Sequence, residues 1–390
     1  MLSVIHWARK SLGQVVLVVS VVALSACVPS GGRSKGPSGG GETVQVALLI
    51  PSGSGQATDE LFGQNLENAA RLAIADLSGV TIDLRVYKTG GSPAQAAALA
   101  VQAVDEGAKI ILGPFYSEEA NAAGAAVSSS GVNVLAFSNN ADIAGGNVFV
   151  LGQTFDNTAR RLASFAVRNG KSKILIVHDR NVAGNVGRAA IERGISAAGG
   201  SVVGVSAYEF SQNGIVQAAT GIVQTVRSSQ ADAIFMTADT AGALPLLSQL
   251  LIDNGVDRAT TKFIGLTRWD IPVATLSMPG VQGGWFAMPD PGLFNQFQAR
   301  YQAAYGAPPV AVAGLAYDGI AAIGALARQG KAEVLTAEAL TQGAGFVGVS
   351  GIFRFLPNGT NERGLAVAEI RDNQVVVIDP SPRSFVGAGF

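Results

Sequence analysis

Short apolar runs alternate with longer amphipathic stretches over most of the chain. The run from Val44 to Ile50 is apolar at all but one position, which is typical of a buried strand. Between Phe62 and Leu77, apolar residues instead recur at the three- and four-residue spacing of a helix face. The two patterns then repeat in turn along the chain. Such alternation predicts βαβ units and parallel sheets.

The other elements follow from the same two patterns. Further strands are expected at Val80 to Tyr87, Lys109 to Leu112, Val132 to Phe137, Ile174 to His178, Val202 to Tyr208, Ala233 to Thr237, Lys262 to Leu266 and Gly284 to Ala287. Further helices are expected at Pro93 to Glu106, Ser117 to Ser129, Asn157 to Asn169, Gly184 to Ala198, Ile215 to Arg227, Leu244 to Asp253, Phe294 to Tyr305 and Val310 to Arg328. Near the end, short antiparallel strands are expected at Gly351 to Phe355, Leu365 to Ile370 and Gln374 to Ile378. Because a second, similar set begins near Phe155, we expect an α/β fold with two similar halves.

Residues 1–26 have the features of a bacterial signal peptide. Arg9 and Lys10 precede the apolar run from Val15 to Leu24, which is shorter than the roughly 20 apolar residues that a membrane span needs. The run ends in LSAC, which resembles the lipobox of lipoproteins and predicts that Cys27 is lipidated and becomes the first mature residue. The alternative is an ordinary secretory signal that is cleaved after Ala26. Because Cys27 is the only cysteine in the chain, it has no disulfide partner within it, and lipidation is the favoured reading.

Residues 27–42 then form the expected lipidated end and flexible tether, since they are rich in Gly, Ser and Pro. Folding should start at Thr43. We therefore expect a periplasmic protein with a lipid anchor in the bacterial membrane. By the resemblance to lipoproteins, Val28 after the cysteine implies the outer membrane.

Composition excludes several functional classes. The chain is 48% hydrophobic, 14% charged and has a formal net charge of -1, so it is globular and has no basic surface for nucleic acid. Outside the signal segment His178 is the only histidine, so the sequence lacks a Cys/His pair and a cluster with metal-ligand spacing. We expect no enzyme activity, no metal and no cofactor.

Several ordered motifs resemble one known family. They are VQVALLIPSGS from Val44, IILGPFY from Ile110, VNVLAFSNN from Val132, ILIVHD from Ile174 and AYDG from Ala316. Together they resemble the leucine-binding-protein family of type I periplasmic binding proteins, and within it the penicillin-binding protein activator branch.

The resemblance implies two doubly wound parallel-sheet lobes joined by three crossovers, near Gln153, Met288 and Gly348. Lobe 1 would comprise residues 43–153 and 288–348, and lobe 2 residues 154–287 and 349–390. The ligand cleft would lie between the lobes, outside the carboxyl ends of the strands, where ligands bind in open α/β sheets.

Small polar residues at the strand ends are the candidate ligand contacts. In lobe 1 they are Ser52, Ser54, Tyr116, Ser117, Ser138, Asn139 and Asn140, and in lobe 2 they are Asp239, Thr240, Arg268 and Asp270. Two of these loops precede helices whose free N–H groups favour an anion. By the resemblance, the lobe 1 loops would contact the carboxylate and amine of an amino acid. Strand-end Ser and Asn are equally turn formers, and both readings stay open.

One position departs from the family. Amino-acid-binding members have an acidic residue at about the position of Arg268, where it binds the ammonium group of the ligand. This chain has a cation there, which puts branched-chain amino acid binding in doubt and favours an anionic group. Asp270 or Asp239 would be the substitute acids.

Two non-enzymatic functions remain. The first is a penicillin-binding protein activator that docks on a peptidoglycan synthase and regulates peptidoglycan synthesis. The alternative is the substrate-binding component of an ABC transporter, which delivers an amino-acid-like or anionic solute to its permease.

Overall fold

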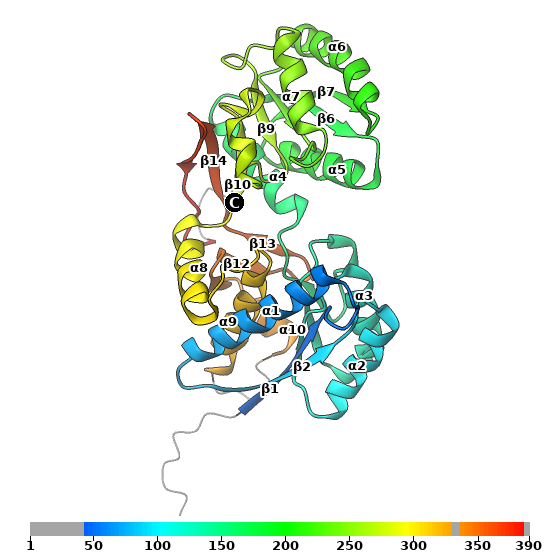
Figure 1. The fold of residues 1–390 in the computed structure, drawn as a ribbon, viewed down its shortest axis with the longest axis vertical. Helices are drawn as coiled ribbons and strands as arrows, with labels where there is room; N and C mark the ends of the chain where they lie inside the picture. Colours follow the sequence, from blue (N-terminus) through cyan, green and yellow to red (C-terminus); the bar gives the residue numbers. More distant parts are fainter. Residues whose placement is uncertain (1–42, 330–334, 386–390) are drawn as a thin grey trace, which may run out of the picture. The chain divides into compact units, whose positions relative to one another are not determined.

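The computed structural model describes residues 43–329 and 335–385, so Cys27 and the tether lie outside the described part. The first set of strands forms a parallel sheet in the order β2-β1-β3-β4-β5. Figure 1 labels β1 and β2 of this sheet and the helices α1, α2 and α3 around it. Its strands are β1 (Thr43–Ile50), β2 (Thr81–Lys88), β3 (Ile110–Leu112), β4 (Asn133–Ala136) and β5 (Val148–Val150). The helices that pack on it are α1 (Ala57–Asp76), α2 (Pro93–Asp105), α3 (Ser117–Ala126), α8 (Pro291–Tyr305) and α9 (Ala313–Ala327).

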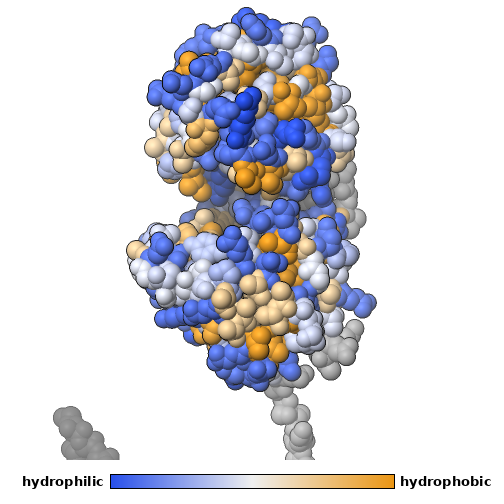
Figure 2. Space-filling model, turned by 90° about the vertical axis from the view of Figure 1, so that its right-hand side faces the viewer, coloured by the Kyte–Doolittle hydropathy of each residue, from blue (hydrophilic) through white to orange (hydrophobic). Residues whose placement is uncertain are grey.

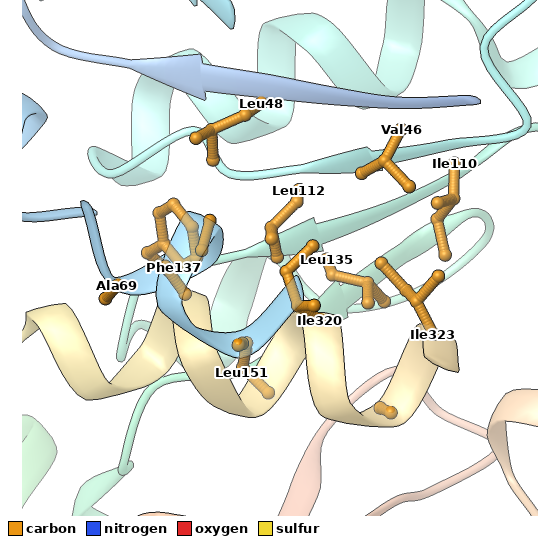
Figure 3. Packing of buried hydrophobic residues seen from close by; sticks show 14 of the residues in the cluster. Val46, Leu48, Ala69, Ile110, Leu112, Leu135, Phe137, Leu151, Ile320 and Ile323 are labelled. Atoms are coloured by element: carbon orange, nitrogen blue, oxygen red, sulfur yellow. The ribbon is translucent and has the colours of Figure 1, made fainter. Parts of the chain in front are cut away.

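Both faces of this sheet are buried because helices pack on each of them, and successive strand side chains point to opposite faces. Val46 and Leu48 lie with α1 and α9, while Ala47 and Leu49 lie with α2 and α3. Figure 3 shows the first of these cores, in which Ile320 of α9 approaches the strand side chains. The carboxyl ends of the strands are thereby fixed at one edge of the lobe.

The second sheet is larger and mixed, in the order β15-β14-β10-β9-β8-β6-β7. Its strands are β6 (Lys173–Asp179), β7 (Ser201–Tyr208), β8 (Ala233–Met236), β9 (Lys262–Gly265), β10 (Trp285–Met288), β14 (Ala366–Arg371) and β15 (Gln374–Asp379). β14 and β15 are antiparallel to their neighbours, and the other pairs are parallel. The helices on its two faces are α4 (Phe155–Arg168), α5 (Val182–Ala197), α6 (Gln212–Ser229) and α7 (Leu244–Asp253).

A third, antiparallel sheet comprises β11 (Phe346–Gly348), β12 (Gly351–Phe355) and β13 (Asn361–Arg363), and the short helix α10 (Ala337–Leu340) precedes it. Phe353 and Phe355 of β12 belong to the core of the first sheet, although lobe 2 is expected to include residues 349–390. The lobe boundaries remain predictions. This packing favours a third crossover nearer Gly364, because β14 returns to the second sheet directly afterwards.

The expected α/β architecture of two lobes is confirmed, and most expected elements occur within a few residues of their predicted bounds. The additional strands β5, β11 and β13 each have only three residues, too few for a periodic pattern. On the face seen in Figure 2, apolar residues form small patches among hydrophilic ones. Within the described ranges, no helix is long and apolar enough to span a membrane.

Candidate ligand-binding site

A pocket of about 430 Å³ lies at the carboxyl ends of strands from both main sheets. Its lining comes from the loops after β3, β4 and β9, from α8 and the start of α9, and from the segments that connect the sheets. The lining residues are Phe115, Tyr116, Ser117, Phe137, Ser138, Asn139, Asn140, Gly152, Gln153, Arg268, Pro289, Phe294, Ala311, Val312, Leu315, Ser350, Arg363 and Leu365. Parallel α/β sheets bind ligands at this edge, so the pocket is the candidate site.

The loop after β3 contributes an aromatic side chain and a helix N-terminus. Tyr116 is the N-cap of α3 and Ser117 is its first residue, so the free N–H groups of the first helical turn lie beside the pocket lining. The Tyr116 hydroxyl donates a hydrogen bond to Asp59, and this bond, with burial, raises the pKa of Tyr116 to about 12. The Tyr116 side chain is therefore neutral, and its hydrogen bond to Asp59 fixes its position.

The loop after β4 is held by local hydrogen bonds of the kind that turn formers make. Ser138 Oγ accepts the N–H of Asn140 at 3.1 Å, and Asn140 Oδ1 accepts the N–H of Asp142 at 3.0 Å. Both residues still line the pocket, as does Asn139. Turn formation and ligand contact are therefore compatible at these positions.

Arg268 approaches the pocket from the second sheet, and an internal ion pair fixes its position. Its Nε donates to Asp270 Oδ1 at 2.8 Å, while Nη2 bonds to Asp270 Oδ2. Between them, Trp269 is fully buried and packs against Gly265 and Gly284, which anchors the loop. Asp270 thus binds the arginine and does not line the pocket.

A second arginine, which the sequence analysis did not identify, lines the pocket from β13. Arg363 is 6% exposed, its Nε donates to the carbonyl of Leu151 at 3.1 Å, and its Nη1 lies 3.1 Å from Asp318 Oδ2. Asp318 Oδ1 accepts the N–H of Val349 at 2.7 Å. Burial raises the pKa of the Asp318 carboxyl, while Arg363 and the Val349 N–H lower it in part. The ion pair joins α9, which contains Asp318, to β13, which contains Arg363. Arg363 also links both to the segment after β5 through the carbonyl of Leu151.

Apolar side chains form the rest of the wall, chiefly Phe115, Phe137, Phe294, Leu315 and Leu365. Phe115 is itself packed between two rings, with centroid distances of 5.1 Å to both Phe62 and Tyr116. The pocket therefore offers a largely apolar interior with few polar groups, as small-molecule sites do.

The structure does not bring every predicted contact to this pocket. Ser52 is buried beside α1, and Ser54 Oγ accepts the N–H of Gln56. Thr240 donates to the carbonyl of Ile271 at 2.7 Å, and Asp239 is exposed in the loop after β8. With Asp270, these residues stay predictions without a place in the pocket lining.

The only histidine outside the signal segment lies within the fold. His178 is 6% exposed, and its Nδ1 lies 3.0 Å from the carbonyl oxygen of Asp179. Among the described residues, no group of three or more His, Cys, Asp or Glu side chains could hold a metal ion.

The chain resembles several solved structures in fold. One is a putative branched-chain amino acid ABC transporter protein from Rhodospirillum rubrum, with 19% identity, a TM-score of 0.74 and coverage of 86% of this chain and 100% of that one. Another is a substrate-binding protein from Desulfitobacterium hafniense in complex with Leu (18%, TM-score 0.63, 86% and 100%). A third is a solute-binding protein from Rhodopseudomonas palustris in complex with 3,4-dihydroxy benzoic acid (20%, TM-score 0.59, 89% and 98%).

Among curated proteins, no sequence matches the chain. The sequence profile of the periplasmic binding protein family, in contrast, matches residues 43–374. That match spans nearly all of the described fold, and the fold has the two α/β lobes of the type I group. The chain therefore belongs to the periplasmic binding protein family, with a type I, leucine-binding-protein-like fold.

Proposed function

We propose that this protein is a non-enzymatic solute-binding protein that captures a small organic molecule in the pocket and delivers it to an ABC permease. One observation carries the proposal: the pocket of about 430 Å³ draws its lining from the strand-end loops of both main sheets. A ligand there would contact both lobes at once. Its binding would favour the conformation in which both sets of contacts are made.

The relatives in complex with Leu and with 3,4-dihydroxy benzoic acid support this function, because both are transporter binding proteins of the same fold. They also leave two ligand classes open, amino acids and aromatic acids. The residues of the pocket, rather than the fold, must decide between them.

The periplasmic location that the family implies is consistent with capture of a solute outside the cell membrane. We further propose that Cys27 carries the lipid anchor, and that the outer membrane receives it. These two points rest on the signal sequence and on Val28.

The activator function rests on the resemblance of the core motifs and on the cation at Arg268 where relatives have an acid, whereas the tether fits both functions. Neither the pocket nor the relatives add support to it. A pull-down from membranes under mild crosslinking distinguishes the two functions. A peptidoglycan synthase as the captured partner would support the activator function. An ABC permease as partner would instead support solute delivery.

Isothermal titration calorimetry of the mature protein tests solute binding. The panel comprises amino acids and small carboxylic acids, and the informative variant is Ala311→Trp, because Ala311 is a small exposed residue of the pocket lining. Its control is Ala303→Trp, on the exposed side of α8. We expect a panel ligand to bind the wild type and the control but not Ala311→Trp. Equal binding by both variants, or no binding to the wild type, would contradict the proposal.

A further inference from the structure

The charged groups of the pocket lining all have one sign. Arg268 and Arg363 are its charged residues, and no Asp or Glu of the described chain belongs to the lining. An α-amino acid brings a carboxylate and an ammonium group, and the ammonium needs an acceptor once it is removed from water. An acid without an ammonium group makes no such demand.

Three carboxylates behind the pocket lining are each bonded by a donor that itself lines the pocket. Asp59 accepts the hydroxyl of Tyr116, Asp270 accepts two N–H groups of Arg268, and Asp318 faces Arg363. In each case the donor, and not the acid, belongs to the pocket lining. The acids thus position donors and are not free to bind an ammonium group.

Arg268 still has unused donors. Asp270 occupies the edge formed by Nε and Nη2, which leaves one hydrogen of Nη1 and one of Nη2 on the adjoining edge. No described residue is bonded to that edge, and the side chain is 24% exposed at the pocket. Two parallel N–H groups match the two oxygens of a carboxylate, and the Asp270 bond holds them in one orientation beforehand.

Arg363 differs in this respect. Its Nε and Nη2 bond to the carbonyl of Leu151 and its Nη1 to Asp318, and its side chain is only 3% exposed. It adds positive charge to the lining but is already engaged by the protein. Arg268 is therefore the better-placed carboxylate partner.

From these observations, and resting on the proposed solute-binding function, we infer that the ligand is an apolar carboxylic acid without an ammonium group. Its carboxylate binds the free edge of Arg268, and its apolar body lies against Phe115, Phe137 and Phe294. The site selects against α-amino acids because their ammonium group meets two arginines and no acidic residue in the pocket lining.

Matched ligand pairs test the inference on the unaltered mature protein. Hydrocinnamate differs from phenylalanine, and isocaproate from leucine, only by the ammonium group. Calorimetry at neutral pH should show each acid binding at least about tenfold more tightly than its amino acid, because the two arginines repel the ammonium group. Hydrocinnamide, which has no charge, should bind at least about tenfold more weakly than hydrocinnamate.

The arginine is tested by Arg268→Gln, with Arg180→Gln as its control on the surface of the second lobe. Loss of a charged hydrogen-bond partner should weaken hydrocinnamate binding at least about 30-fold in Arg268→Gln and leave it unchanged in the control. Circular dichroism verifies that both variants fold. If Arg268→Gln does not fold, the comparison of hydrocinnamide with hydrocinnamate on the unaltered protein still tests the inference.

The outcomes separate the inference from the function on which it rests. Amino acids that bind as tightly as their matched acids, or an amide that equals its acid, overturn the inference while solute binding stands. No binding by any pair member overturns both. An acid that binds tightly to Arg268→Gln overturns the role of Arg268.

Discussion

Replacing Asp318 with Asn removes the negative charge that faces Arg363 but keeps a side chain of nearly the same shape. Both partners are almost fully buried, with side-chain exposures of 3% for Arg363 and 0% for Asp318. The amide oxygen can still accept the N–H of Val349. Arg363 would keep the carbonyl of Leu151 but lose its only acidic partner among the described residues.

Breaking a buried ion pair by neutralising one partner costs about 3–5 kcal/mol, because the other charge remains buried without compensation. We expect Asp318→Asn to lower the free energy of unfolding by about 3 kcal/mol, near the lower limit, since the Leu151 carbonyl still solvates Arg363. Urea unfolding followed by circular dichroism measures the difference.

The control is the surface pair of Arg180 and Glu209, whose side chains are 59% and 63% exposed. Glu209→Gln should cost less than about 1 kcal/mol. The double variant Asp318→Asn with Arg363→Met should recover much of the loss, because no unpaired charge stays buried. The reasoning is refuted if Asp318→Asn costs no more than Glu209→Gln, or if the double variant is less stable than Asp318→Asn.

Three further predictions concern other parts of the chain. The pKa of Glu369 is lowered because, against the opposing effect of burial, Trp285, Arg371 and Lys262 stabilise its charge. A carboxyl group whose pKa is lowered by folding stabilises the protein above its unfolded pKa, and this stability is lost as the pH falls through its folded pKa. Glu369→Gln should therefore make the free energy of unfolding fall less steeply on the acid side. An unchanged pH profile would contradict this. Gly265→Ala should destabilise by about 1–3 kcal/mol, since the new methyl group meets the ring of Trp269, whereas Gly221→Ala in open space on α6 should stabilise by about 0.5–1 kcal/mol in thermal unfolding. Cys27→Ser should move the protein from the membrane fraction to the soluble periplasm, and a variant that stays in the membrane fraction would rule out the lipid anchor.

The sequence predicts elements where local periodicity is strong. β1 and α7 occur at or within one residue of their expected bounds, because an apolar run with a single polar position and a helical stripe are each visible within ten residues. β13 is different: its three residues, Asn361 to Arg363, are polar and are defined only by their pairing with β12. No local pattern encodes such a partner.

The same contrast holds in the pocket. Ser117, Ser138 and Arg268 follow predicted strands, so the rule that ligands bind at strand ends was enough to identify them as candidates. Arg363 lies in β13 and Phe294 in α8, away from the ends of the predicted strands, and the sequence contains no motif that places them in the pocket. The pairing of Arg268 with Asp270 was also missed, because two residues at the same loop can act as separate contacts or as one ion pair.

The way the chain is divided between the two sheets affects when each can fold during synthesis. The core under β1 needs Ile320 of α9 and Phe353 of β12, and the core under β8 needs Ala368 and Ile370 of β14. Domains usually fold as units, with the N-terminal one first. In this chain β1 is synthesised first, but its core is completed only by residues that are synthesised more than two hundred positions later. A ribosome-bound chain that ends before β12 should thus expose unfilled apolar surface in both halves, and a C-terminal truncation should damage the later half first.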